Sequence, residues 1–400
     1  MGYFANFIKK TGCERRIETV FSARMHPRAV RIVVFGAGAM GSFFGGLLSR
    51  RHDVTLIGRT EHMEAIRARG LRITGKTSMI ARPHAATRVP AGAKPDLIFV
   101  TTKSYDTDKA TVALRPFADE AVFVTVQNGL GNAEAIAKVA KRVVAGTTTH
   151  GVTSLGPGEI RHAGVGETVL GAWVGIREAD LVRLRDLLAD AGVVVRITGD
   201  VKTELWSKLV VNASINPLAA LAGVPNGRLV RDKALLASLE AVCREATSVA
   251  KAEGAAVDPD ELYHRTVLVA RRTAANRGSM LQDLDRHRRT EIDSITGAVV
   301  RAAARHEIPV PLNRALLALV RARESAGREA SDGNLTAGSI GLTRIPPCAD
   351  PLTGTKLLRQ ATTRREIIPT SDVLVVASDE ASDRPSPTPS NRPSHPRMVG

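Results

Sequence analysis

The sequence predicts an α/β fold, in which a doubly wound parallel sheet is followed by an all-helical C-terminal domain. Up to about residue 198, short β-branched runs alternate with helix-like segments, a pattern typical of parallel βαβ units. From about residue 200 to 330, apolar residues recur at helical spacing and strand-like runs are scarce. Because 400 residues exceed what one hydrophobic core usually supports, we expect two domains plus accessory segments.

The first domain is expected at residues 29–199 and the second at 200–330, with the join near the stretch TGDVKT. A segment late in the first domain, HGVTSLGPGEIRHAGVGETVLGA, breaks the alternation because two β-like arms flank GPGE. We predict an antiparallel hairpin there. The runs expected to form the parallel strands are RIVVF, DVTLI, DLIFV, AVFVTV and RVVAGTTTHG.

The two ends of the chain have a different composition. Residues 1–28 are basic, and Met25 is an alternative start, so this N-terminal extension is left out of the fold prediction. Residues 331–400 are rich in proline and end in SDRPSPTPSNRPSHPR, which predicts a disordered tail. The short apolar run DVLVV inside this tail is either a chance feature or a partner-binding strand.

Composition excludes several classes of function. The net charge of +16 comes from dispersed arginines, and only 4% of residues are aromatic, which argues against a nucleic-acid partner. No run of about 18 uncharged apolar residues exists, so we expect no membrane span. Three distant cysteines, without C-x-x-C spacing, indicate neither a disulfide framework nor a metal site and favour a cytoplasmic location. A homodimer is compatible with the sequence, which does not determine the oligomeric state.

A glycine-rich turn, GAGAMG, directly follows the first strand candidate and opens a helix-like segment. That order is the context in which G-x-G-x-x-G binds a dinucleotide, so a Rossmann-type domain is predicted. The first glycine permits the tight turn, the second lets backbone approach a pyrophosphate, and the third lets helix and strand pack closely. The alternative is a glycine turn without a ligand. The predicted cofactor-binding residues of the turn are Gly36, Ala37, Gly38, Ala39, Met40 and Gly41.

Three further residues are predicted at the rim of the cofactor crevice. Arg59 stands near the position where NAD-binding proteins carry an acid, and a guanidinium suits a 2′-phosphate, which favours NADPH. Glu61 complicates this interpretation, and a solvated loop charge is the alternative for Arg59. Asn128 and Lys103 each follow a parallel strand, and the alternatives are an Asn-Gly turn and a solvated lysine.

The stretch ELWSKLVVNASINPL places three polar residues, Lys208, Asn212 and Asn216, four positions apart in an apolar segment. On a helix they form one polar stripe, which needs hydrogen-bonding partners if it is buried. A polar ligand between the domains would supply them, and intramolecular hydrogen bonds are the alternative. An ammonium beside a reacting ketone can protonate the developing alkoxide, and carboxamides can orient a substrate. Pro217 is expected to kink or end this helix.

A second polar segment, GSMLQDLDRHRRTEIDSITG, contains two further candidates. Ser279 and Gln282 have capping-box spacing, so Ser279 is expected to cap a helix or to bind a substrate carboxylate. Glu291 stands beside Ile292 at the edge of an apolar face and could accept a hydrogen bond from a substrate hydroxyl. Its alternative is a surface ion pair with a neighbouring arginine, either Arg288 or Arg289.

Taken together, these motifs resemble the ketopantoate reductase family over about residues 30–328. The resemblance rests on GAGAMG, VTTKSYDT, VQNGLGN, ELWSKLVVNASINPLAALAGVPNG and GSMLQDLDRHRRTEIDSITG, in family order. It implies an NADPH-dependent Rossmann domain, a helical domain and an active site between them. The expected reaction is reduction of 2-dehydropantoate to (R)-pantoate, a step towards pantothenate and coenzyme A.

The resemblance also implies a role for each candidate residue. Lys208 matches the catalytic general acid, and Glu291 matches the carboxylate that binds the substrate hydroxyl. Substrate-contacting positions are matched by Asn128, Asn212, Asn216 and Ser279, and cofactor-side positions by Arg59, Lys103 and Asn128. The alternatives are a related reductase of another 2-oxo or hydroxy acid, a β-hydroxyacid dehydrogenase, and a non-catalytic NADPH-sensing module.

Overall fold

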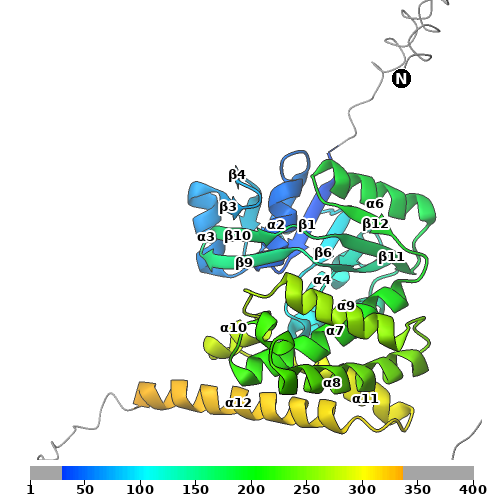
Figure 1. Cartoon of the computed structure of the whole chain (residues 1–400). Coiled ribbons are helices and arrows are strands. Elements are labelled where there is room, and N and C mark those ends of the chain that lie inside the picture. The colour runs from blue at the N-terminus through cyan, green and yellow to red at the C-terminus, as the bar shows by residue number, and fades with distance from the viewer. Residues whose placement is uncertain (1–28, 337–400) are drawn as a thin grey trace, which may run out of the picture. The chain divides into compact units, whose positions relative to one another are not determined.

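The computed structural model describes residues 29–336. Its larger sheet has eight strands in the order β12-β11-β8-β7-β6-β1-β2-β5 (Figure 1). In this order, the strands from β8 through β7, β6, β1 and β2 to β5 all run parallel, as βαβ units require. Strand β11 is antiparallel to β8 and parallel to β12. The strands are β1 (Arg31–Phe35), β2 (Asp53–Ile57), β5 (His84–Ala86), β6 (Leu97–Val100), β7 (Val122–Thr125), β8 (Val143–Thr148), β11 (Thr168–Val174) and β12 (Val195–Ile197). All five predicted parallel strands are therefore present.

Each face of this sheet buries its own core, because side chains alternate along a strand. In β1, Ile32 and Val34 pack in one core with Phe43 and Phe44 of α2, whereas Val33 packs in the other with Leu114 of α4. Helices on both faces make the sheet doubly wound, as predicted. The helices of this half are α2 (Ala39–Leu48), α3 (Thr60–Arg69), α4 (Thr107–Leu114), α5 (Asn132–Ala137) and α6 (Glu178–Asp190).

The predicted hairpin forms, since β9 (Gly151–Gly156) and β10 (Glu159–Gly164) pair antiparallel. The sequence did not indicate that the hairpin joins two earlier strands. β10 pairs parallel with β3 (Leu71–Gly75), which pairs antiparallel with β4 (Met79–Ala81). The result is a second sheet of four strands, in the order β4-β3-β10-β9.

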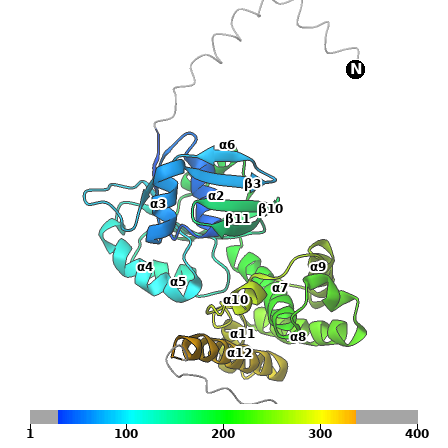
Figure 2. The same ribbon diagram turned by 90° about the vertical axis from the view of Figure 1, so that its left-hand side faces the viewer.

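Residues 200–336 are helical, as predicted. Figures 1 and 2 show α8, α9 and α10 gathered around α7, and their buried side chains share one core. The helices are α7 (Val201–Ala222), α8 (Lys233–Ala252), α9 (Pro259–Arg272), α10 (Ser279–Asp285), α11 (Thr296–Arg305) and α12 (Pro311–Thr336), with a 3-10 turn η4 (Asn226–Val230). We call residues 29–199 the sheet half and 200–336 the helical half. All of these residues lie in one compact unit, and separate folding of the halves stays a prediction.

Pro217 was expected to kink or end α7, and the helix does not end there. The side chain of Asp200 caps the start of α7 by accepting a hydrogen bond from Thr203 N, and the helix continues through Pro217 to Ala222. A proline inside a helix removes one backbone hydrogen bond and costs about 3 kcal/mol. Because α7 is packed against α8, α9, α10 and α12, tertiary burial offsets that cost. The helix ends instead at Gly223, whose φ of 68° is the left-handed conformation of a C-terminal cap.

The extension at 1–28 and the apolar run DVLVV lie outside the described residues, as does the predicted tail beyond Thr336. α12 itself continues past the expected boundary near residue 330. Within residues 29–336, no helix is both long and apolar enough to cross a membrane.

Candidate active site

The glycine turn lies where the sheet changes winding direction, because β1 is flanked by β2 on one side and by β6 on the other. Gly36 has a φ of 107°, and a Cβ there would lie 2.5 Å from Thr102 N, so only glycine fits. A Cβ at Gly41 would lie 2.4 Å from Gly36 O, as the predicted close packing requires. By contrast, a Cβ at Gly38 would meet nothing within 4 Å. The backbone at Gly38, which begins α2, is therefore open to a ligand such as a pyrophosphate.

Arg59 lies just past the carboxyl end of β2 and immediately precedes α3. Its side chain is exposed and makes no hydrogen bond or ion pair with any described residue, including Glu61 in the first turn of α3. Ala37 donates its backbone N–H to Ile57 O, at 2.8 Å, which fixes the glycine turn against the end of β2. The turn and Arg59 are thus neighbours at one edge of the sheet.

The polar stripe of α7 has the predicted arrangement. Lys208, Asn212 and Asn216 are half-buried, while the residues between them are buried. None of the three side chains forms a hydrogen bond with another described residue. A Cβ at Gly278 would lie 3.5 Å from Asn216 Oδ1, so the stripe reaches the start of α10. Since unpaired buried amides are costly, intramolecular hydrogen bonding does not account for the stripe, and a polar ligand would.

Burial lowers the pKa of Lys208 to about 8, although the negative charge of Glu291 partly opposes this. An ordinary lysine has a pKa near 10.5. The ammonium of Lys208 is therefore still mostly protonated at neutral pH, and its proton is easier to transfer than that of a solvent-exposed lysine.

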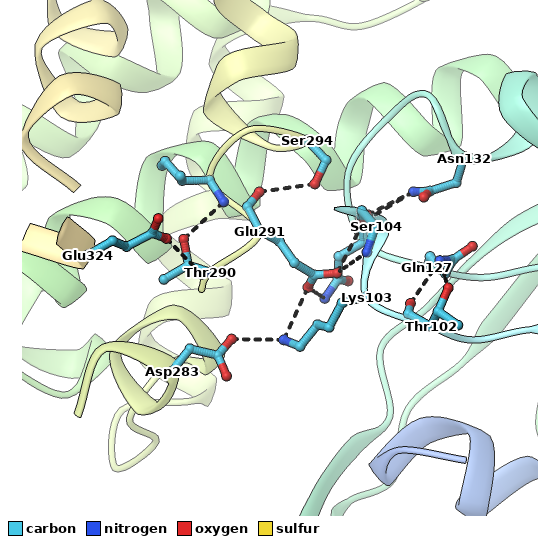
Figure 3. A network of polar contacts seen from close by, with 12 residues as sticks. Thr102, Lys103, Ser104, Gln127, Asn132, Asp283, Thr290, Glu291, Ser294 and Glu324 are labelled. Carbon is cyan, nitrogen blue, oxygen red and sulfur yellow. Dashed lines mark hydrogen bonds and ion pairs between the residues drawn. The ribbon is translucent and has the colours of Figure 1, made fainter. Parts of the chain in front are cut away.

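Glu291 is buried, with 8% of its surface exposed, and every side-chain partner comes from the sheet half. Figure 3 shows its carboxylate facing the loop that follows β6. Oε1 accepts hydrogen bonds from Ser104 N and Ser104 Oγ, both at 3.1 Å. Oε2 accepts one from Asn128 Nδ2 at 3.5 Å and lies 3.6 Å from Lys103 Nζ. The two halves of the molecule therefore meet at this carboxylate.

Lys103 is not the solvated lysine that was the alternative to a cofactor-binding role. Its Nζ lies 2.8 Å from Asp283 Oδ2 of α10, and Figure 3 shows it between Asp283 and Glu291. Burial alone would lower the pKa of Lys103, but the carboxylates of Glu291 and Asp283 raise it above its usual value. Lys103 therefore remains a fixed cation at neutral pH.

The loop that carries Asn128 is held rigidly. The carbonyl oxygen of Asn128 accepts hydrogen bonds from Ser104 Oγ at 2.6 Å and from Asn132 Nδ2 at 3.0 Å. Gly129 has a φ of 82°, and a Cβ there would lie 2.6 Å from Ser294 O. Leu130 N donates a hydrogen bond to Ser294 O at 2.9 Å. The Asn-Gly turn is thus real, and it also fixes the segment that carries Glu291.

Two of the alternatives left open for these residues are wrong. Ser279 does not cap α10, because Gly278 takes that position and Ser279 is the first helical residue, with an exposed side chain and no hydrogen bond to a described residue. Gln282 instead donates its side-chain N–H to Arg277 O, at 2.8 Å. Glu291 does not pair with an arginine: Arg289 pairs with Asp293, at 3.0 Å. The chain between α10 and α11 is not helical, so its residues do not follow the assumed helical faces.

The structure gathers the candidates into two groups. The glycine turn and Arg59 lie at the carboxyl ends of β1 and β2, and the second group surrounds Glu291. Sequence analysis missed Ser104 and Asp283, although both stand inside motifs that it singled out. No cluster of side chains suited to a metal ion occurs among residues 29–336. The residues that contact Glu291 or interact with its charge are Lys103, Ser104, Asn128 and Lys208. Asp283 pairs with Lys103, and Asn212 and Asn216 continue the polar stripe of Lys208.

A glycine turn at the switch point of a parallel sheet, together with a half-buried lysine beside a buried carboxylate, defines a Rossmann-type oxidoreductase. Comparison with known proteins agrees. The families described as "Ketopantoate reductase PanE/ApbA" and "Ketopantoate reductase PanE/ApbA C terminal" match residues 32–175 and 200–324. The chain belongs to the ketopantoate reductase family.

Individual relatives cover most of the chain. It is 41% identical, over 304 residues, to a 2-dehydropantoate 2-reductase of Halobacterium salinarum, a match that spans 74% of this chain and 100% of the relative. A solved ketopantoate reductase of Ralstonia eutropha JMP134 has a TM-score of 0.70 at 35% identity, covering 75% of this chain and 100% of the other. A D-mandelate dehydrogenase solved with NADH and anilino(oxo)acetate has a TM-score of 0.72 at 26% identity, covering 75% and 99%.

Proposed function

We propose that this protein catalyses the NADPH-dependent reduction of 2-dehydropantoate to (R)-pantoate, a step towards pantothenate and coenzyme A. One observation carries the proposal: Lys208 is half-buried, has no hydrogen-bond partner among the described residues, and lies within electrostatic reach of Glu291. Two carboxamides without partners continue its stripe along α7. A 2-oxo acid with a nearby hydroxyl offers the oxygens that such a site lacks.

The sheet half fits a dinucleotide. Gly38 offers open backbone at the start of α2, and the glycines on either side of it tolerate no side chain. Arg59, exposed beyond β2, supports NADPH over NADH because a guanidinium pairs with a 2′-phosphate. Lys103 and Asn128 would border the nicotinamide end of the crevice. When bound there, NADPH would supply the hydride that reduces the substrate carbonyl.

Lys208 acts as the general acid. Negative charge develops on the carbonyl oxygen during reduction, and the Lys208 ammonium stabilises that charge and transfers a proton to the oxygen. The neutral amine then takes a proton from solvent, which a pKa of about 8 permits at neutral pH. Such a proton transfer contributes about 10²–10⁴-fold to a rate.

The other polar groups orient the substrate. Glu291 accepts a hydrogen bond from the substrate hydroxyl. Ser104 and Asn128 hold the carboxylate of Glu291 in place. Asn212 and Asn216 bind the substrate oxygens along the face of α7, and Ser279 donates to the substrate carboxylate near Asn216. These residues define a substrate with a ketone, a carboxylate and a hydroxyl group.

Reduction of another 2-oxo acid is the second candidate, because the D-mandelate dehydrogenase is similar in fold at 26% identity. The two candidates share the fold and the hydride chemistry, and they differ in the group beside the ketone. Glu291 favours 2-dehydropantoate, since a buried carboxylate suits a hydroxyl better than an aromatic ring. A homodimer and a cytoplasmic location stay predictions.

The test is oxidation of the nicotinamide cofactor by purified full-length protein, followed by absorbance. Ketopantoate and phenylglyoxylate, the 2-oxo acid corresponding to mandelate, are each supplied with NADPH and with NADH. Turnover of ketopantoate with NADPH supports the proposal. Turnover of phenylglyoxylate but not of ketopantoate would show that the proposed substrate is wrong. Equal turnover with NADH would show that the proposed preference for NADPH is wrong. Lys208→Met is the control that separates catalysed from background oxidation.

A further inference from the structure

A second arginine stands beside Arg59 at the edge of the sheet. β2 and β5 pair in parallel, and the last paired residues are Ile57 and Ala86. Gly58 N donates to Ala86 O at 3.1 Å, so the ladder continues one step beyond the strands. Arg59 and Arg88 each stand two residues beyond these last paired residues, so both follow the carboxyl ends of adjacent parallel strands at the same edge of the sheet. Neighbouring strands lie about 4.8 Å apart.

Both arginines lack a partner. Each side chain is exposed, and neither forms a hydrogen bond or an ion pair with a residue in the range 29–336. The only acid in the first turn of α3, Glu61, pairs with neither arginine. Two arginines at the same edge of the sheet, neither of them paired with a carboxylate, offer a site for an anion.

We propose that Arg88 is a second determinant of cofactor specificity, which binds the 2′-phosphate of the adenosine ribose together with Arg59. The inference rests on the proposed use of NADPH. A phosphate monoester carries close to two negative charges and three acceptor oxygens, and planar guanidinium groups match such a group with paired hydrogen bonds.

The local charges explain why one arginine is not enough. Arg59 and Glu61 are two positions apart, and together they carry no net charge. Arg88 makes this edge of the sheet cationic, so the site attracts a dianion despite Glu61. A 2′-hydroxyl gains nothing from this charge, and Arg88 therefore separates the two cofactors rather than strengthening dinucleotide binding in general.

The experiment measures the binding of 2′,5′-ADP and 5′-AMP to the full-length protein by calorimetry, and of NADPH and NADH by fluorescence. Arg88→Ala should raise the Kd of 2′,5′-ADP and NADPH about tenfold, and should change that of 5′-AMP and NADH less than about twofold. Arg88→Lys, which keeps the charge but not the planar fork, should fall between Arg88→Ala and the wild type. The matched control is Arg82→Ala, since Arg82 is exposed just before β5, at its other end.

The outcomes separate this inference from the proposed function. Wild-type binding of 2′,5′-ADP by Arg88→Ala, with a loss in Arg59→Ala, would overturn the role of Arg88 and leave NADPH use intact. A wild-type protein that binds 2′,5′-ADP no better than 5′-AMP would overturn both Arg88 and the choice of NADPH, while turnover with NADH would still establish the reductase. Inorganic phosphate serves as a competitor: it should displace 2′,5′-ADP more readily from the wild type than from Arg88→Ala, and equal displacement from both proteins would contradict the inference.

Discussion

Lys103 and Lys208 belong to opposite halves of the molecule and both interact electrostatically with Glu291, yet their surroundings differ. Lys103 follows β6 and forms ion pairs with two carboxylates, those of Asp283 and Glu291. Lys208, on α7, forms no ion pair or hydrogen bond with any described residue. Burial lowers the pKa of Lys208 to about 8, whereas the two carboxylates outweigh burial at Lys103 and raise its pKa.

The difference separates two kinds of lysine. A lysine with paired carboxylates keeps its proton and stabilises the arrangement of its partners. A lysine that is desolvated and unpaired has a weakly held proton and no competing hydrogen bond, as a general acid requires. The number of neighbouring carboxylates, and not burial by itself, is the reason why the proposed proton transfer is given to Lys208 and not to Lys103.

Removal of each lysine tests this assignment most directly. Lys208→Ala should lower kcat by about 10²–10⁴-fold, because the variant lacks the proposed general acid. Lys103→Ala should lower kcat/KM by only about tenfold, chiefly through KM, because it loosens Glu291 without removing the acid. Steady-state kinetics measures both, and unchanged NADPH binding by Lys208→Ala serves as the control. Equal losses of kcat in the two variants would contradict the comparison.

Removal of the shared carboxylate should affect both rate and pH dependence. Glu291→Gln should lower kcat/KM about 10²-fold, since an amide replaces the buried carboxylate that we propose as the acceptor for the substrate hydroxyl. In the wild type, kcat/KM should fall as the pH rises through about 8, where Lys208 loses its proton. Because the charge of Glu291 raises the pKa of Lys208, the falling limb should move to lower pH in Glu291→Gln. A limb that stays in place would show that another group titrates.

The fold was largely predictable because its signals are local. Parallel strands buried on both faces are runs of β-branched residues, and RIVVF followed by a glycine turn indicates strand, turn and helix in order. The four-stranded sheet was not predictable, since β4 has three residues and β3 pairs with the distant β10. The continuation of α7 through Pro217 was likewise not predictable, because tertiary packing outweighs the local preference of proline for a helix end.

The candidate site was predictable only as a set of residues, and their contacts depend on the tertiary structure. Nothing in the sequence indicates that Lys103 meets Asp283, which lies 180 positions away. Glu291 and Asp293 stand two positions apart in RTEID, yet Glu291 faces the sheet half while Asp293 pairs with surface arginines. The irregular turn between α10 and α11 decides which acid points inward, and helical periodicity does not describe such a turn.

The two lysines should also differ in what they contribute to stability. Lys208→Met should raise the free energy of unfolding by about 1–3 kcal/mol, since an ammonium with a lowered pKa opposes folding. Lys103→Met should lower it by a similar amount, because two carboxylates lose their cation. Between about pH 8 and 10.5 the unfolded chain binds more protons at Lys208 than the folded one. Wild-type stability should therefore rise across that range relative to Lys208→Met. Denaturant unfolding at several pH values measures this, and parallel curves would contradict it.

The smallest effect is expected at Ser104, which holds the carboxylate that the two lysines share. Its hydroxyl has one proton and two acceptors, Asn128 O at 2.6 Å and Glu291 Oε1 at 3.1 Å, while its backbone N–H also binds Oε1. Ser104→Ala keeps the N–H, so kcat/KM should fall only about fivefold, and Ser104→Thr should restore most of it. The falling limb near pH 8 should not move, because Glu291 stays in place and keeps its charge beside Lys208. A limb that shifts towards acid in Ser104→Ala would show that the hydroxyl, and not the backbone, holds Glu291 within reach of Lys208.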